Sequence, residues 1–169
     1  MKVPVIYIMG VSGSGKTTIG KKLSGAAGIP FFDADDFHSK ANKEKMKAGR
    51  PLNDTDREDW LATINQLAKN EAGKNGAIIA CSALKERYRT LLSAGIEDKV
   101  QWIFLQGDKK VISERMKARK DHFMPESLLQ SQFETLEAPG SNAIIIDISK
   151  SPDEIVNTIL DVLNTRNVN

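Results

Sequence analysis

Five short apolar runs recur along the chain, and most of them lack a strict alternation of apolar and polar positions. Strands that are covered on both faces show this pattern, whereas strands with one wet face alternate. The pattern predicts buried strands at Val5–Met9, Ile29–Phe32, Ala77–Cys81, Val100–Leu105 and Ala143–Ile148.

Stretches with helical spacing of their apolar residues separate these runs. They are Lys16–Ala26, Thr55–Asn70, Lys85–Ala94, Lys109–Arg119, Pro125–Leu136 and Pro152–Leu163. A chain in which strand and helix alternate in this way folds as an α/β domain around a parallel sheet. Such a sheet binds its ligands at the carboxyl ends of its strands.

Two segments exceed this minimal pattern. Residues 35–75 hold about two helices where one crossover would suffice, and residues 119–125 form a charged hinge between two predicted helices. We expect one domain over residues 1–169, with an insertion at about 35–75 that binds an acceptor. A mobile lid is expected at about 115–127.

The eight residues from Gly10 to Thr17, called the octet below, carry the most specific chemistry in the chain. The octet matches the phosphate-binding pattern G-x-x-x-x-G-K-[ST] between a predicted strand and a predicted helix. Its glycines let successive N–H groups point at one anion, and the helix N-terminus adds positive partial charge. Lys16 is expected to reach the β- and γ-phosphates of ATP, and the Thr17 hydroxyl to ligate Mg²⁺. The predicted nucleotide-binding residues are Gly10, Val11, Ser12, Gly13, Ser14, Gly15, Lys16 and Thr17.

An acidic cluster follows the second predicted strand, at the sheet edge where the octet must lie. A carboxylate there can hold Mg²⁺ through water, and another can orient or deprotonate an attacking hydroxyl. We assign Asp33 to the metal and Asp35 to the acceptor hydroxyl, with His38 as a possible acceptor contact. The alternative is a solvated acidic turn that caps the next helix.

Cations follow the third predicted strand and also lie at the start of the helix predicted at Thr55–Asn70. Lys85 and Arg89 are four residues apart, on one helical face at the end of the strand, and two cations there suit an anionic acceptor. Arg57 is a further candidate for an acceptor contact. The alternatives are a solvated basic helix face for the pair and an ordinary capped helix start around Arg57.

Two more arginines border the charged hinge. Phosphoryl transfer spreads negative charge over the γ-phosphate oxygens, and a cation delivered by a closing lid stabilises that charge. Arg119 is the candidate for this catalytic role, and Arg115 for a contact with the nucleotide. The alternative is a helix C-terminus whose cations complement its dipole.

The composition limits the kinds of partner that the protein is expected to bind. The chain has 169 residues and a formal net charge of +2, from 24 Lys and Arg against 22 Asp and Glu, which is too balanced for a general nucleic-acid binder. A single cysteine, Cys81, excludes an internal disulfide and favours a reducing compartment. Neither a signal peptide nor an apolar run of 18 residues is apparent. We expect a cytoplasmic protein without nucleic-acid or membrane partners.

Together these motifs resemble one family of P-loop kinases, the small bacterial-type gluconokinases, which are related to shikimate kinase and the nucleoside-monophosphate kinases. The resemblance rests on GVSGSGKT, DADDFH, GRPLNDTDREDWL, CSALKERYR, ERMKARKDHF and QFETLEAPG, which span residues 10–140. It implies a three-layer fold with sheet order 2-3-1-4-5, ATP-dependent phosphorylation of D-gluconate to 6-phospho-D-gluconate, and a homodimer. It also implies that Asp35 faces the gluconate hydroxyl.

The same resemblance places Lys85 and Arg89 in the sugar-acid pocket, and Arg115 and Arg119 beside the nucleotide. One departure is visible, because an expected Asp-Gly-Asp turn reads Asp-Ala-Asp at residues 33–35. Without the resemblance, the residues indicate only a small-molecule kinase with a polar, anionic acceptor. Shikimate or another polar acceptor is therefore the alternative to gluconate. A switch GTPase is disfavoured, because its Asp-x-x-Gly motif does not occur in the sequence.

Overall fold

The computed structural model describes residues 4–119 and 125–166, and its centre is a parallel sheet. The sheet has five strands in the order β2-β3-β1-β4-β5, which confirms the predicted fold class and strand order. β1 lies in the middle, paired with β3 through Val5 and Ala77 and with β4 through Val5 and Val100. The strands are β1 Val5–Met9, β2 Phe31–Asp33, β3 Ala77–Ala80, β4 Val100–Gln106 and β5 Ala143–Asp147.

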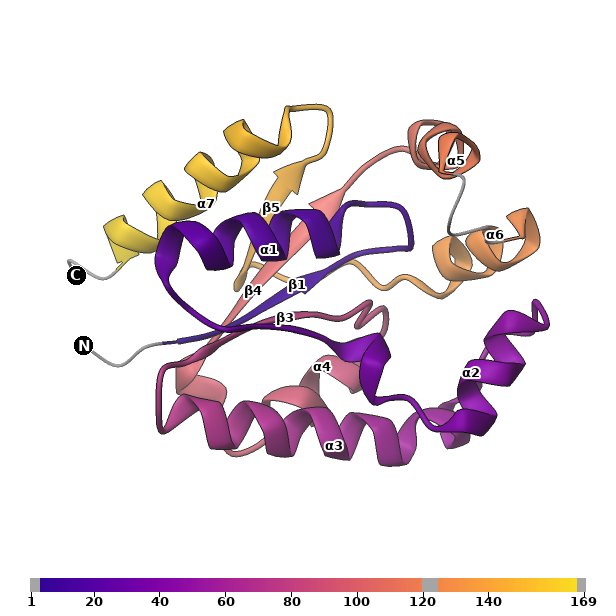
Figure 1. The fold of residues 1–169 in the computed structure, drawn as a ribbon, viewed down its shortest axis with the longest axis horizontal. Helices are drawn as coiled ribbons and strands as arrows, with labels where there is room; N and C mark the ends of the chain where they lie inside the picture. The colour runs from indigo at the N-terminus through magenta and orange to yellow at the C-terminus, as the bar shows by residue number, and fades with distance from the viewer. Residues whose placement is uncertain (1–3, 120–124, 167–169) are drawn as a thin grey trace.

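Helices cover both faces of this sheet. α1 and α7 lie on one face and α3 and α4 on the other, while α2, α5 and α6 gather beyond the carboxyl ends of the strands (Figure 1). In the described residues, no helix is both long enough and apolar enough to span a bilayer. The helices are α1 Lys16–Ala27, η1 Ala34–Phe37, α2 Lys40–Lys47, α3 Asp54–Ala72, α4 Glu86–Ser93, η2 Glu97–Lys99, α5 Lys109–Ala118, α6 Glu126–Thr135 and α7 Pro152–Arg166.

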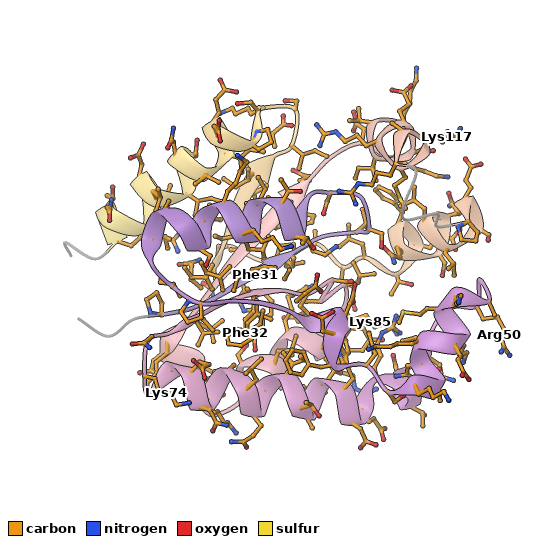
Figure 2. The ribbon with its side chains drawn as sticks, in the orientation of Figure 1. Phe31, Phe32, Arg50, Lys74, Lys85 and Lys117 are labelled. Atoms are coloured by element: carbon orange, nitrogen blue, oxygen red, sulfur yellow. The ribbon has the colours of Figure 1, made fainter. Side chains whose placement is uncertain are left out.

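β1 to β4 contribute side chains to two separate cores, whereas the edge strand β5 contributes to one and leaves Ile145 55% exposed. Ile6 and Ile8 pack with residues of α1 and α7, whereas Tyr7 packs with residues of α3 and α4. Figure 2 shows the same division in β2, where Phe31 and Phe32 lie on opposite faces. Because both faces of β1 to β4 are covered, apolar residues occupy consecutive positions, and this is why these strands lack alternation in the sequence.

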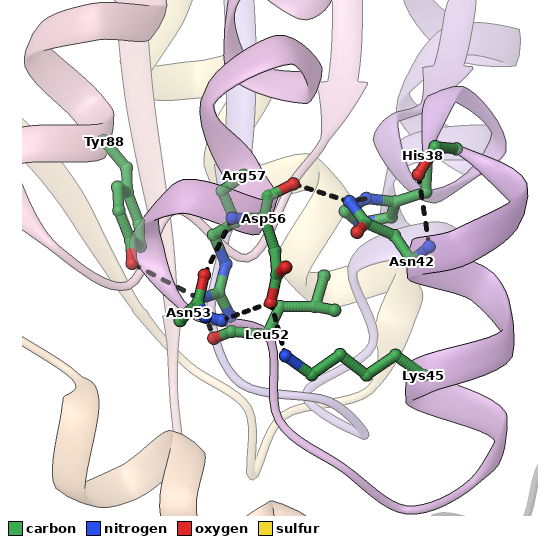
Figure 3. A network of polar contacts seen from close by, with 9 residues as sticks. His38, Asn42, Lys45, Leu52, Asn53, Asp56, Arg57 and Tyr88 are labelled. Atoms are coloured by element: carbon green, nitrogen blue, oxygen red, sulfur yellow. Dashed lines mark hydrogen bonds and ion pairs between the residues drawn. The ribbon is translucent and has the colours of Figure 1, made fainter.

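The long segment between β2 and β3 is built from η1, α2 and α3. A capping box fixes the start of α3: Asp56 N–H donates to Asn53 Oδ1 at 2.8 Å, and Asn53 N–H donates to Asp56 Oδ2 at 2.9 Å. Lys45 and Asn42 on α2 also contact Asp56, at 2.6 Å to its carboxylate and 2.7 Å to its carbonyl oxygen (Figure 3). The network holds α2 against the N-terminus of α3.

Most element ends differ from the prediction by one to three residues, and two of these differences have a clear structural reason. The second strand begins at Phe31 rather than Ile29, because Pro30 has no N–H to give to a sheet ladder; its carbonyl still accepts from Ile78 N–H at 2.8 Å. The helix expected from Lys85 begins at Glu86, and Lys85 is its N-cap residue in an extended conformation. The second difference changes the geometry of the site.

Neighbouring leucines on α4 give a test of the core. Leu92 is fully buried against the sheet, whereas Leu91 is 43% exposed. We expect Leu92→Ala to lower the free energy of unfolding by about 2–5 kcal/mol, because it leaves a cavity between α4 and β1. Leu91→Ala should change it by less than about 0.5 kcal/mol. Urea denaturation measures both, and equal losses would contradict the assigned packing of α4.

Candidate active site

The octet forms a loop between β1 and α1, with its amides at the N-terminus of the helix. Gly13 and Gly15 have φ angles of 81° and 102°, a left-handed conformation that favours glycine. Within the described residues, the N–H groups of Gly15, Lys16 and Thr17 find no acceptor in the protein. Lys16 Nζ donates to the carbonyl oxygens of Gly10 and Val11, at 3.0 and 3.1 Å. These orphan amides and the ammonium form a cradle for an anion.

The predicted nucleotide-binding residues do not all face the same side. Val11 and Ser14 are 2% exposed and turned into the protein, and the Ser14 N–H donates to Val11 O at 3.2 Å. Gly13 faces α5 so closely that an added Cβ would lie 2.6 Å from Met116 Cγ. The loop therefore has a packed inner side and an open outer side.

Asp33 joins the loop to the acidic turn. Its Oδ2 accepts from the Thr17 hydroxyl at 3.0 Å, and its Oδ1 accepts from Asp35 N–H at 3.0 Å. No cluster of three or more His, Cys, Asp and Glu side chains suited to a metal occurs in the described parts of the chain. Two neighbouring oxygen ligands still fit Mg²⁺, which takes few protein ligands and completes its shell with water and substrate phosphates.

Asp35 stands on η1, and its backbone is fixed from behind. Trp60 Nε1 donates to Ala34 O at 2.7 Å, and the Trp60 ring stacks on His38 with centroids 4.2 Å apart. The Asp35 side chain is open to a cleft, but the surrounding walls limit its hydration and raise the pKa of its carboxyl. The Lys16 ammonium opposes this rise.

His38 lines neither of the two clefts described below. Its Nε2 lies 3.8 Å from Asp35 Oδ1, and its Nδ1 lies 3.5 Å from Asn42 Nδ2 (Figure 3). Burial, together with the positive charges of Arg57 and Lys43, lowers the pKa of its imidazole to about 4. The structure thus makes His38 a neutral support of η1 rather than a wall of a cleft.

A cleft of about 810 Å³ opens in front of the loop. Its walls include loop residues, Asp33, Asp35, Cys81 and Arg119, which is the C-cap residue of α5. Burial raises the pKa of the Cys81 thiol to about 12, so the thiol stays protonated. Arg115 lies outside this wall, and its Nη2 donates to Ile148 O at 2.6 Å, in the loop after β5.

A second cleft, of about 550 Å³, lies between the start of α3, α4 and α6. Its charged residues are Arg50, Arg57, Lys85 and Asp54, an excess of positive charge. Figure 2 shows Lys85 at the carboxyl edge of the sheet, on the side of Arg50. The α6 wall is made of Leu128, Ser131, Gln132 and Thr135.

Asp54 organises this second cleft, although it is not among the candidate residues that the sequence motifs predicted. Its carboxylate accepts from Lys85 Nζ at 3.0 Å, from Arg87 Nη1 at 3.3 Å and from the Tyr88 hydroxyl. The hydrogen bond from Tyr88, followed by that from Lys85, lowers the pKa of the Asp54 carboxyl. Arg57 Cζ lies 5.3 Å and Lys85 Nζ 5.5 Å from the centre of the Tyr88 ring, so this tyrosine contacts two of the three cations predicted to bind an acceptor.

Arg89 is not brought to the second cleft with Lys85. It is 7% exposed, and its guanidinium donates to Ala83 O at 2.7 Å and to Glu137 O at 2.9 Å. The spacing argument failed because Lys85 is an extended N-cap residue, so residues four apart do not share a helical face here. Ala83 has a φ angle of 46°, and Arg89 fixes this strained residue just before Lys85.

We expect Arg89→Met to lower the stability of the fold more than it weakens acceptor binding. Two buried carbonyl oxygens would lose a charged donor, which should lower the free energy of unfolding by about 2–4 kcal/mol. The KM of the acceptor should change less than in Lys85→Met, which truncates a cation of the second cleft and serves as the matched comparison. Urea denaturation and steady-state kinetics measure the two effects. Unchanged stability with a raised KM would show that Arg89 contacts the acceptor.

A phosphate-binding loop, carboxylates at the end of β2 and a cation-rich second cleft define a P-loop kinase that acts on a small molecule. The model of the family described as shikimate kinase matches residues 12–164, which agrees with this class.

Similarity to individual proteins defines the family more narrowly. The chain is 47% identical to a probable gluconokinase of Dictyostelium discoideum, over 94% of this chain and 86% of that protein. It is 43% identical to a gluconokinase of Arabidopsis thaliana, over 94% of this chain and 92% of that protein. The crystal structure of a gluconokinase from Sinorhizobium meliloti 1021 superposes with a TM-score of 0.84 at 40% identity, over 92% of this chain and 89% of that one. The chain belongs to the gluconokinase family, as the sequence motifs predicted.

Proposed function

We propose that this protein transfers the γ-phosphoryl group of ATP to a hydroxyl of D-gluconate and releases 6-phospho-D-gluconate. The observation that carries the proposal is the second cleft, whose three cations and one carboxylate leave a positive excess for an acceptor carboxylate. Asp54 and Tyr88 offer polar partners for hydroxyl groups in the same cleft. The relatives named above support gluconate rather than shikimate as the acceptor.

On the donor side, the loop amides and Lys16 hold the phosphates of ATP. Thr17 and Asp33 would hold Mg²⁺, which, when bound, neutralises charge on the β- and γ-phosphate oxygens. Their oxygens are 3.0 Å apart, which is close enough for both to ligate one ion. Arg115, beside Ile148, remains a proposed nucleotide contact outside the phosphate cleft.

In the proposed transfer, Asp35 accepts the proton of the gluconate hydroxyl. The hydroxyl oxygen forms a bond to the γ-phosphorus, and the bond from that phosphorus to the bridging oxygen of ADP breaks. A raised pKa makes the Asp35 carboxylate a stronger base, and the nearby Lys16 ammonium helps keep it ionised. Arg119 faces the same cleft and stabilises charge on the transferred group.

The acceptor is held by Arg57 and Lys85, with His38 acting through η1. Part of the predicted lid at 115–127, residues 120–124, lies outside the described residues. The insertion at 35–75, the homodimer and the cytoplasmic location remain predictions as well.

An acceptor screen tests this function. With ATP and Mg²⁺, the protein should release ADP on addition of gluconate and not on addition of shikimate or AMP, measured by a coupled ADP assay. Lys16→Ala should abolish the release, since the ammonium that contacts the γ-phosphate is lost, and this variant controls for contaminating kinases. Release with shikimate but not gluconate would overturn the acceptor assignment.

Substituting Asp35 separates chemistry from nucleotide binding. We expect Asp35→Asn to lower kcat by roughly 10²- to 10⁴-fold, because the proton of the hydroxyl loses its acceptor. The Kd of a non-hydrolysable ATP analogue, measured by calorimetry, should stay within about twofold, since Asp35 supplies no contact to the nucleotide. Asp36→Asn, at the neighbouring exposed carboxylate, is the matched control and should keep kcat close to wild type. A parallel loss of kcat and analogue affinity in Asp35→Asn would contradict its role as base.

A further inference from the structure

One side chain of α6 bridges the two clefts. Ser12 N–H donates to Gln132 Oε1 at 2.7 Å, and Gln132 Nε2 donates to Ser12 Oγ at 3.1 Å. Ser12 lines the phosphate cleft, and Gln132 lines the second cleft. The contact joins residues that are 120 positions apart in the sequence. The QFETLE segment to which Gln132 belongs has no role in the transfer described above.

The pairing restrains Ser12 more tightly than one bond would. An amide presents a donor and an acceptor at fixed separation, so two bonds to one residue set both the backbone and the side chain of Ser12. The residue before it, Val11, offers its carbonyl to Lys16 Nζ at 3.1 Å and to Ser14 N–H at 3.2 Å. A displacement of Ser12 would therefore move Lys16 as well as the loop.

A second helix holds the next residue of the loop. Gly13 packs against Met116 on α5, and an added Cβ there would also lie 3.1 Å from Ile112 Cγ2. α5 and α6 thus contact consecutive loop residues, one by packing and the other by hydrogen bonds. The position of the loop depends on where these two helices lie.

We propose that Gln132 is a positioning residue that holds the Ser12 end of the phosphate-binding loop against α6 and couples nucleotide binding to occupancy of the second cleft. An acceptor in that cleft contacts the α6 wall and restrains the helix that carries Gln132. The loop is then already ordered when the nucleotide binds, so each ligand favours the other. The coupling half of this inference rests on the proposed function, whereas the positioning half does not.

Gln132→Met tests the bridge, because methionine keeps the length and flexibility of glutamine but makes neither bond. We expect the Kd of a non-hydrolysable ATP analogue with Mg²⁺, measured by calorimetry without acceptor, to rise about tenfold, the expected effect of losing two hydrogen bonds. In wild type, saturating gluconate should tighten analogue binding by about fivefold or more. In Gln132→Met this factor should fall close to one.

Gln130 on the same helix provides the matched control. It contacts Lys109 and Glu134 and lines neither cleft, so Gln130→Met should keep both the analogue affinity and the coupling factor. Ser12→Ala removes one of the two bonds from the other side and should produce an intermediate loss of affinity. Urea midpoints of all the variants show whether the fold is retained.

Several results would overturn the inference. If Gln132→Met raises only the Kd of gluconate and leaves analogue affinity unchanged, Gln132 is an acceptor contact and not a positioning residue. If wild type phosphorylates gluconate but saturating gluconate leaves the Kd of the ATP analogue unchanged, the proposed coupling is wrong. If wild type releases no ADP with gluconate, the proposed function and the coupling both fail, while a tenfold loss of analogue affinity in Gln132→Met still supports the positioning role.

Discussion

The two hydrogen bonds of the Asp33 carboxylate unite the halves of the site. One oxygen accepts from Thr17 at the start of α1, and the other accepts from the backbone of Asp35 on η1. The donor loop and the acidic turn come from different crossovers of the sheet, so nothing local in the chain brings them together. A carboxylate at the end of β2 does so because parallel strands all end at one edge.

The sheet itself follows closely from the sequence. Runs such as Val5–Met9 are buried on both faces, and this constraint leaves a continuous apolar signal that few other structures produce. The phosphate-binding role of the octet could also be predicted from its glycines and Lys16, because a phosphate-binding loop requires a specific residue at each fixed position. The order of the strands came from the resemblance, since periodicity carries no information about which strands pair.

Residues that act through tertiary contacts were harder to foresee. Helical spacing predicted that Lys85 and Arg89 lie together, but Lys85 is an extended N-cap residue. Lys85 lines the second cleft, whereas Arg89 is buried beside it. Asp54 reads as an ordinary acidic residue of a first helical turn, and only the fold brings Tyr88 and Lys85 to it. Gln132 carries no charge and no motif chemistry of its own, so its contact with Ser12 had no signal in the residues alone.

The site follows a common physical arrangement, in which exposed charges are aimed by buried, uncharged or fully paired neighbours. Asp35 keeps access to solvent while Trp60 and a neutral His38 fix its backbone. Limited hydration already raises the pKa of the Asp35 carboxyl, and complete burial would oppose the ionised form that accepts a proton. Support through the backbone holds Asp35 without that further desolvation. The buried guanidinium of Arg89 fits the same arrangement, because it holds carbonyl oxygens beside the second cleft instead of presenting its charge there.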